Sequence, residues 1–249
     1  MRWLLAGLLL GLAGCAPHPH DRMVLWHIVH GACVPHFAAT GSPAPCLAVH
    51  PHAGYALLKD RDGATQVLLI PTARVTGIED PAVRAPDAPD YLALAWAERG
   101  VVARLAGRAL RRRDIALAVN AIAGRTQDQL HIHIDCVQPA VRAAVAAQAA
   151  GLNAAWRRFP VPLMDQPYLA RVVVGRSLAG VNPFRLLADQ VPGAAGAMGQ
   201  WTLAVLGVRL PPDGRAGFVL LAGHVNPRTG DRGAGERLQD HACALARAG

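Results

Sequence analysis

Lysine is almost absent from this chain: Lys59 is the only one among 249 residues. Lysine and arginine together number 25 against 17 acidic residues, so arginine carries nearly all of the positive charge, which is formally +8. Arginine binds phosphates and carboxylates through paired hydrogen bonds, which lysine cannot do. Its excess fits either an anionic partner or a general bias of the genome toward arginine and alanine, and both explanations are open at this point.

Aromatic residues are also scarce, at 5% of the chain. Proteins that bind single-stranded nucleic acids stack bases on aromatic side chains and gather their basic residues along one groove. Here the arginines are scattered except for the run at residues 111–113. We therefore expect no nucleic acid partner, and an anionic partner would be a phospholipid surface or a phosphate substrate.

The N-terminal apolar run, residues 3–13, is too short to cross a bilayer comfortably, since a spanning helix takes about 20 residues. It follows one positive charge and leads into Leu12-Ala13-Gly14-Cys15, an arrangement typical of a cleaved signal segment. The tetrapeptide resembles the processing site of bacterial lipoproteins, in which the cysteine becomes lipidated. We expect a signal peptide at 1–14, a lipid on Cys15 and a tether at 15–22. The protein would be anchored to a cell membrane on its periplasmic side; an uncleaved anchor is the alternative.

The chain lacks any CxxC pair, which argues against a four-cysteine metal site. Apart from Cys15 it has four cysteines, and an even number in an oxidising compartment predicts two disulfides. Four cysteines allow three pairings. The short spacing of Cys33 and Cys46 makes their pairing the simplest, which would leave Cys136 with Cys243.

Apolar periodicity and turn residues predict a mixture of helices and antiparallel strands. Helices are expected near 23–31, from Tyr91 after an Asp90 cap, over 139–150, after an Asn182 cap with Pro183 in the first turn, and over 235–248. Strands are expected in a hairpin at 53–72, at 114–121, in the histidine segment that ends at 136, at 168–174, and in a hairpin around 211–215. This mixture predicts an α+β fold, with residues 23–249 as one domain.

Two histidines stand out in residues 124–136, which read GRTQDQLHIHIDC. Apolar and polar residues alternate there as in a strand, so His131 and His133 share one face with Gln129 and Asp135. Three roles are open for the pair. It forms a solvated polar face, it binds Zn²⁺ with a third ligand, or it contains a nucleophile for phosphoryl or nucleotidyl transfer. The candidates for the third ligand are Asp135, His224 and His241.

The surrounding residues favour the nucleophile. The stretch AVNAIAGRTQDQLHIHID resembles the signature of the histidine-triad superfamily, in which three alternating histidines follow a polar glycine loop and an upstream asparagine. His131 and His133 stand at the second and third triad positions, and Asn120 matches the asparagine. Gln129 stands where the superfamily has its first histidine, which is a clear departure.

The resemblance extends over about residues 23–244. The segments PHAGYALLKDRDGATQVLLIPTARVTGIEDP, LAWAER, ALAVNAIAGRTQ, HIHIDC, YLARVV, NPF and DHACA follow one another as in the bacterial CDP-diacylglycerol pyrophosphatases. This family resemblance implies an antiparallel sheet of the histidine-triad type with flanking helices. It also implies attachment to a membrane surface and hydrolysis of CDP-diacylglycerol to CMP and phosphatidic acid, without a metal or cofactor. Whether the protein is a monomer or a homodimer is open.

The resemblance also implies roles for the site residues. His131 would attack the phosphorus that bears the cytidine, with its other ring nitrogen held by a backbone carbonyl, and His133 would bind the non-bridging oxygens. The further candidates for substrate binding are Asn120, Arg125, Thr126, Gln129 and Lys59. Several of these also have a simpler explanation, since Asn120 would brace the loop and Arg125 and Lys59 would be solvated.

Two questions follow from the departure at Gln129. A glutamine cannot act as an acid, so proton handling would fall to Asp128 or to water. The missing histidine also supports a second hypothesis, a lipid-anchored nucleotide-binding or lipid-binding protein that kept the fold and lost activity. A third hypothesis is a zinc-dependent phosphoesterase that uses His131 and His133.

Overall fold

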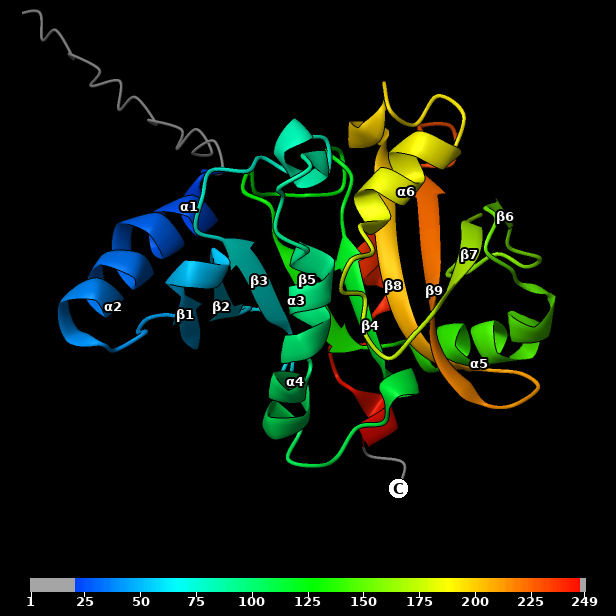
Figure 1. Ribbon diagram of the computed structural model, residues 1–249, viewed down its shortest axis with the longest axis horizontal. Helices are drawn as coiled ribbons and strands as arrows, with labels where there is room; N and C mark the ends of the chain where they lie inside the picture. The colour runs from blue at the N-terminus through cyan, green and yellow to red at the C-terminus, as the bar shows by residue number, and fades with distance from the viewer. Residues whose placement is uncertain (1–20, 247–249) are drawn as a thin grey trace, which may run out of the picture.

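One antiparallel sheet of nine strands, in the order β1-β2-β3-β5-β4-β8-β9-β7-β6, organises the computed structural model of the protein, which describes residues 21–246 (Figure 1). The strands are β1 (Ala48–His50), β2 (Tyr55–Lys59), β3 (Val67–Pro71), β4 (Ile115–Val119), β5 (Ile132–Cys136), β6 (Arg157–Arg158), β7 (Leu169–Val174), β8 (Trp201–Leu210) and β9 (Arg215–His224). The predicted α+β class is confirmed. The predicted signal peptide, Cys15 and the tether up to residue 20 lie outside the described residues.

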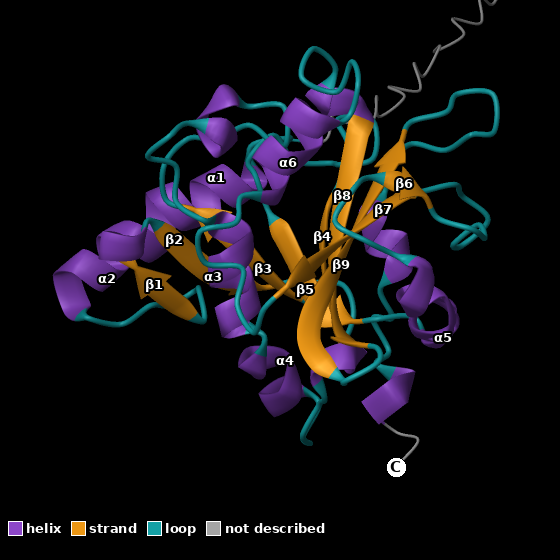
Figure 2. Ribbon diagram, turned by 45° about the vertical axis from the view of Figure 1, so that its right-hand side comes forward, coloured by secondary structure: helices purple, strands orange, loops and turns teal. Residues whose placement is uncertain are grey.

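Short helices connect and cover the strands (Figure 2). The α-helices are α1 (Val24–Ile28), α2 (Val34–Thr40), α3 (Tyr91–Glu98), α4 (Gly100–Leu105), α5 (Pro139–Gln148) and α6 (Pro183–Gln190). The π-helical turn η1 (Val29–Cys33) joins α1 to α2. The 3₁₀ turns are η2 (Pro51–Ala53), η3 (Pro81–Arg84), η4 (Arg112–Asp114), η5 (Ala149–Gly151), η6 (Met198–Gln200), η7 (Gly235–Leu238) and η8 (Ala244–Ala246). Within residues 21–246, no helix has the length and apolar character needed to cross a membrane.

Both predicted hairpins are present. Strands β2 and β3 pair from Tyr55 opposite Pro71 to Lys59 opposite Val67. Strands β8 and β9 pair along their whole length, and Gly214 in the turn between them has φ 71°. Glycine adopts this left-handed conformation without the steric cost that a side chain would bring. The local turn residues therefore specify both strand pairings.

Two helix caps illustrate what local sequence can predict. Asn182 caps α6 as expected, because its Oδ1 accepts from the backbone N–H groups of Phe184 at 3.0 Å and Arg185 at 3.2 Å. Helix α3 begins at Tyr91 as expected, but the predicted cap by Asp90 is wrong. The Asp90 carboxylate instead accepts from the backbone N–H of Gly180 at 2.9 Å, so a tertiary contact replaces the cap.

The prediction that the first helix ends near Gly31 is wrong. The helical segment continues through η1 to Thr40, and Gly41, with φ 75°, ends it. Glycine inside a helix costs only about 1 kcal/mol relative to alanine. Burial of Leu25, Val29 and Cys33 along one side of the segment outweighs that cost.

The predicted closing helix over residues 235–248 is also wrong for its described part. Residues 235–246 contain only the turns η7 and η8. The Asp240 carboxylate accepts from the backbone N–H groups of Ala242 at 3.1 Å and Ala244 at 2.6 Å, and such bonds compete with helix formation. Cys243 has φ 48°, a conformation that a helix does not allow.

Both expected disulfides form. Cys33 and Cys46 join the first helical segment to the loop before β1, with 5.7 Å between their Cα atoms. Cys136 and Cys243 join the end of β5 to the C-terminal segment, with 5.2 Å between their Cα atoms. The simplest of the three pairings is therefore confirmed, and the second disulfide holds residues 235–246 against the sheet.

The two faces of the sheet differ. One face carries a continuous core beneath α3, α4 and α6 (Figure 1). The other face carries two separate apolar clusters. The first cluster packs Leu25 and Val29 on strands β2 and β3, and the second packs Val141 of α5 on strands β4, β8 and β9. Strand β5 lies between β3 and β4, so it separates these two clusters.

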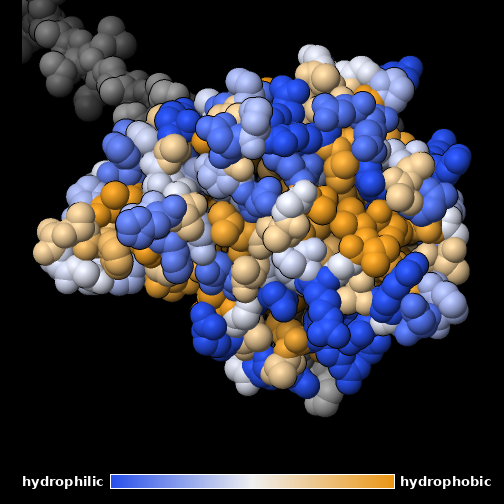
Figure 3. All heavy atoms as spheres, viewed as in Figure 1, coloured by the Kyte–Doolittle hydropathy of each residue, from blue (hydrophilic) through white to orange (hydrophobic). Residues whose placement is uncertain are grey.

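The outer surface mixes hydrophilic and hydrophobic residues (Figure 3). On the face seen in Figure 3, hydrophobic residues gather beside α6, over the region of β8 and β9. Val174, the last residue of β7, is 57% exposed, the largest value among the exposed large apolar side chains of residues 21–245.

Gly207 of β8 offers a test of the main core. The Trp96 and Phe218 rings meet edge to face at 4.9 Å, and a Cβ at Gly207 would lie 2.4 Å from Trp96 Cη2 and 2.6 Å from the Arg112 carbonyl oxygen. Gly207→Ala is expected to lower the free energy of unfolding by about 1–3 kcal/mol, measured by urea denaturation. Gly196→Ala is the matched control, since a Cβ at that position would meet no heavy atom within 4 Å. Equal stability of the two variants would contradict this packing.

Candidate active site

Gln129, His131, His133 and Asp135 form a polar row in β5 and just before it, on the sheet face that carries the two apolar clusters. His133 pairs with Leu68 of β3 on one side and with Ala118 of β4 on the other, and these residues belong to different clusters. The rings of His131 and His133 lie 5.0 Å apart at an angle of 68°. The predicted alternation is confirmed, because Ile132 packs into the core on the opposite face.

His131 is held in one tautomer. Its Nδ1 lies 2.7 Å from the backbone carbonyl oxygen of Gln129, which can only accept, so Nδ1 carries the proton. This is the kind of contact that the family resemblance implies. Burial is the main cause that lowers the pKa of His131 to about 4, with the neighbouring His133 adding to it. The ring is therefore neutral at pH 7, and Nε2 keeps a free lone pair.

His133 is held from the opposite side of its ring. The amide Nε2 of Gln66 lies 3.1 Å from His133 Nδ1 and 2.6 Å from Asp60 Oδ2, so one amide N–H serves each partner. We assign the proton of the His133 ring to Nε2, because the Gln66 amide nitrogen is a donor and makes Nδ1 an acceptor. This Nε2 is buried and has no hydrogen-bond partner among residues 21–246. An unpaired buried donor costs about 1–3 kcal/mol, so the group is well suited to bind an oxygen of a ligand.

Glu236 is a site residue that the sequence did not reveal. It comes from η7, and its Oε2 lies 3.2 Å from His133 Nδ1. Asn120 holds it twice: the Asn120 amide donates to Glu236 Oε1 at 3.1 Å, and the Glu236 backbone N–H donates to Asn120 Oδ1 at 3.3 Å. Burial raises the pKa of Glu236. The predicted residue Asn120 therefore belongs to the site, where it positions a carboxylate.

A second pair, Asp135 and His241, lies at the other end of the row. Asp135 is fully buried and accepts from Thr65 Oγ1 at 2.6 Å, and it lies 2.9 Å from His241 Nδ1. The hydrogen bond to Asp135 is the main cause that raises the pKa of His241. From the sequence, both residues are candidates for the third zinc ligand, and Asp135 shares a strand face with the two histidines. Their contact joins the C-terminal segment to β5.

The loop before His131 is held by ion pairs. Arg125 donates two hydrogen bonds of 2.6 Å to the carboxylate of Glu79 and contacts Asp128. Asp128 also accepts from Arg22 at 2.7 and 2.8 Å, and this contact is the main cause that lowers its pKa to about 2. Asp128 therefore does not hold a proton at neutral pH. Thr126, a predicted substrate-binding residue in the same loop, is exposed.

Two other predicted residues contact protein atoms. The Gln129 amide donates to the carbonyl oxygens of Pro71 at 3.0 Å and Ala73 at 2.8 Å, and its Oε1 accepts from Arg74 at 3.0 Å. Lys59 donates to the carbonyl oxygens of Asp60 at 2.5 Å and Gly63 at 2.8 Å within the β2–β3 turn. The structure thus brings His131, His133 and Asn120 together and places Gln129 and Lys59 in supporting contacts.

The zinc hypothesis needs a third ligand. No group of three or more His, Cys, Asp or Glu side chains in the described part of the chain is arranged to hold a metal ion. His224 lies on β9, where its Nδ1 contacts the Val225 carbonyl oxygen at 2.8 Å and its ring meets Trp201.

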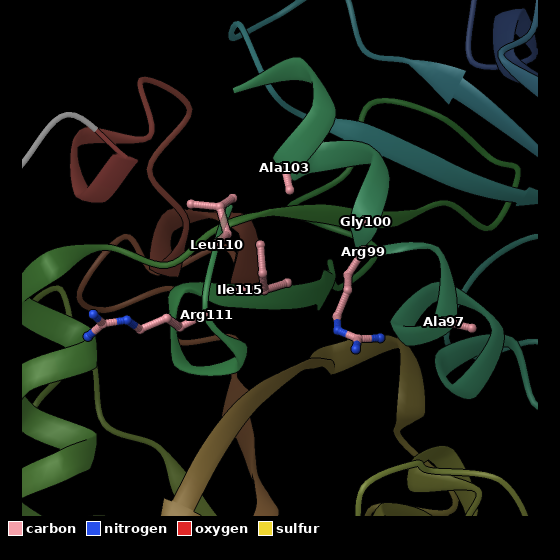
Figure 4. Close-up of a pocket in the computed structure, with 7 residues that line it drawn as sticks. All are labelled: Ala97, Arg99, Gly100, Ala103, Leu110, Arg111 and Ile115. Atoms are coloured by element: carbon pink, nitrogen blue, oxygen red, sulfur yellow. The ribbon is translucent and has the colours of Figure 1, made fainter. Parts of the chain in front are cut away.

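A separate cavity of about 210 Å³ lies between α3, α4 and the start of β4 (Figure 4). It is lined by Ala97, Arg99, Gly100, Ala103, Leu110, Arg111 and Ile115. Ile115 belongs to the core on the face opposite the histidine row. The cavity contains neither histidine and is not part of the candidate active site.

Comparisons with known proteins identify the family of the chain. The family model for CDP-diacylglycerol pyrophosphatase matches residues 20–247. A Yersinia pestis protein named CDP-diacylglycerol pyrophosphatase is 42% identical over 221 residues, which cover 89% of this chain and 84% of that protein. The prediction of an enzyme of this family is confirmed, whereas membership of the wider histidine-triad superfamily stays a prediction. With nearly the whole described chain matched, the protein belongs to the CDP-diacylglycerol pyrophosphatase family.

Proposed function

We propose that this protein hydrolyses CDP-diacylglycerol to CMP and phosphatidic acid, with His131 as the nucleophile. The observation that carries the proposal is the pairing of a neutral His131, whose Nδ1 is occupied by the Gln129 carbonyl, with the unpaired buried Nε2 of His133. One ring offers a lone pair and the other offers an N–H donor. Family membership supplies the substrate class.

The reaction would proceed in two displacements. In the first, Nε2 of His131 attacks the phosphorus that bears the cytidine, and the bond from that phosphorus to the bridging oxygen breaks. Phosphatidic acid leaves with the bond electrons, and the CMP group remains on His131. In the second, water attacks the same phosphorus, releases CMP and restores neutral His131. A covalent intermediate divides one difficult step into two easier ones.

His133 would stabilise both transition states. Its Nε2 donor would bind a non-bridging oxygen of the phosphorus, where negative charge increases as the bonds exchange. A donor fixed before the reaction, in a site shielded from water, is worth about 10²–10³ in kcat. Gln66 and Asp60 keep this nitrogen protonated by occupying the opposite side of the ring.

Membrane attachment through Cys15 remains part of the proposal. Arg22 is ion-paired with Asp128, three residues before His131. Cys15 and Arg22 are seven positions apart, so the chain between them spans at most about 25 Å when extended. A lipid on Cys15 would therefore keep the site close to the bilayer that contains the lipid substrate. In α1, Leu25 is buried and the Trp26 ring stacks on the His30 ring, with 4.1 Å between the ring centroids.

Histidine substitutions test the assigned roles. His131→Ala is expected to lower kcat at least about 10⁴-fold, because the nucleophile is lost, and His133→Ala about 10²–10³-fold. CMP release from CDP-diacylglycerol by the purified protein is the measurement, with and without EDTA. The exposed His52 gives a matched control, since His52→Ala should behave as wild type. Undiminished turnover by His131→Ala would refute the nucleophile, and loss of wild-type activity in EDTA would favour the zinc hypothesis.

The pH dependence of the first displacement gives an independent test. His131 acts in its neutral form, and its pKa is lowered to about 4. A lowered pKa keeps the nucleophile active to lower pH than an ordinary histidine, whose pKa is about 6.5. We expect the rate of the initial burst of phosphatidic acid release, which reports this step, to change little as pH falls from 7 to 5.5. A midpoint of its acid limb near 6.5 would contradict the burial of His131.

Cys15→Ser tests the anchor separately from the chemistry. Lipidated wild-type protein should fractionate with membranes, whereas the variant should lose covalent lipid on this residue. Activity of both proteins toward CDP-diacylglycerol dispersed in detergent should be equal, because the contacts that hold both histidines come from residues within 21–246. Mass spectrometry of the N-terminal peptide identifies the lipid. An unmodified Cys15 in the wild type would overturn the anchor.

A further inference from the structure

The second displacement requires a group that accepts a proton from the attacking water, and most nearby groups are unsuitable. Asp128 is held by Arg22 and Arg125, which stabilise its ionised form too strongly for it to be a useful base. Asp135 is fully buried and its two oxygens contact Thr65 and His241. Gln129 is an amide whose donors and acceptor are already engaged.

Glu236 differs from these groups in access. Its side chain is 30% exposed, although Oε1 is held by Asn120 and Oε2 lies 3.2 Å from His133 Nδ1. Strands β4 and β5 pair as far as Ala118 opposite His133, and Asn120 and His131 stand two residues further along each chain. The residue that holds Glu236 therefore follows β4 at the end of the strand pair where His131 lies, and the exposed part of the Glu236 carboxylate is accessible to water.

The backbone fixes Glu236 in this place. A Cβ at Gly235 would lie 2.2 Å from Thr202 Oγ1, which itself donates to the Val119 carbonyl oxygen at 2.7 Å. The Gly233 carbonyl oxygen accepts from the Ala121 N–H at 2.9 Å. The segment is thus packed closely on the end of β4, directly before Asn120.

We propose that, in the hydrolysis proposed above, Glu236 is the catalytic base that activates water against the nucleotidyl-histidine. As the water oxygen bonds to phosphorus, its proton passes to the Glu236 carboxylate, and the electrons of the breaking P–N bond return to His131 Nε2. The protonated carboxyl then passes its proton to solvent. The inference rests on the proposed function, since it concerns the second step of that reaction.

The surroundings of Glu236 support its use as a base. Oε2 and the unprotonated Nδ1 of His133 lie 3.2 Å apart, which is hydrogen-bond distance once either atom carries a proton. Burial also raises the pKa of the carboxyl, which makes the carboxylate a stronger base than an exposed glutamate.

Glu236→Gln separates the two displacements. The substitution keeps the size of the side chain and removes the base, so the first step should proceed and the second should slow. We expect kcat to fall at least about 100-fold, while CDP-diacylglycerol labelled in the cytidine-bearing phosphate leaves label on the protein. The label should be acid-labile and absent from His131→Ala. Glu98→Gln, a carboxylate on α3 at the opposite face, is the matched control and should match wild type.

Glu236→Ala with added formate is a second test, and restored activity would also show that the variant is folded. A small carboxylate that occupies the vacated space should restore part of the activity. Slow turnover of Glu236→Gln without accumulated label, or turnover within about 3-fold of wild type, would overturn the role of Glu236 and leave the proposed function intact. Absence of CMP release by wild type would instead overturn the proposed function, and the role of Glu236 with it.

Discussion

His131 donates its Nδ1–H to the Gln129 carbonyl oxygen over 2.7 Å, and the chemical character of the whole site depends on this bond. It fixes which nitrogen is available, and it requires the backbone at Gln129 to stay in place. The Gln129 side chain meets that requirement through its hydrogen bonds to Pro71 and Ala73. Gln129 therefore supports His131, the proposed nucleophile, through the backbone, by holding the carbonyl oxygen that orients its ring.

Burial of the polar row has two opposing effects. It lowers the pKa of both histidines and so keeps them neutral, which suits a nucleophile and a donor. It would also leave polar groups without solvent, and the structure offsets this with partners from distant segments. Gln66 comes from the β2–β3 hairpin, Asn120 from the end of β4 and Glu236 from η7. Three separate regions of the chain therefore contribute residues that surround β5 at the site.

The sequence predicted well where its signals were local. Turn residues specified both hairpins, Asn182 specified its own helix cap, and alternation specified which way His131 and His133 point. It failed where distant contacts decide the outcome. The Asp90 carboxylate accepts a hydrogen bond from the Gly180 N–H instead of capping its helix. In the C-terminal segment, the Asp240 carboxylate accepts from a nearby backbone N–H group, and no helix forms. Glu236 could not be predicted as a site residue. Asn120, which hydrogen-bonds to it, is 116 positions away, and no local sequence pattern indicates the contact.

The dependence on η7 has a consequence for shortened forms of the chain. A chain that ended before residue 236 would contain both histidines, the strand that carries His133, and the residues Arg22 and Asp128. It would lack the carboxylate beside His133, the His241 contact to Asp135 and the disulfide to Cys243. A truncation at this point would therefore remove a carboxylate, an imidazole and a disulfide partner together, while both histidines stay in the chain.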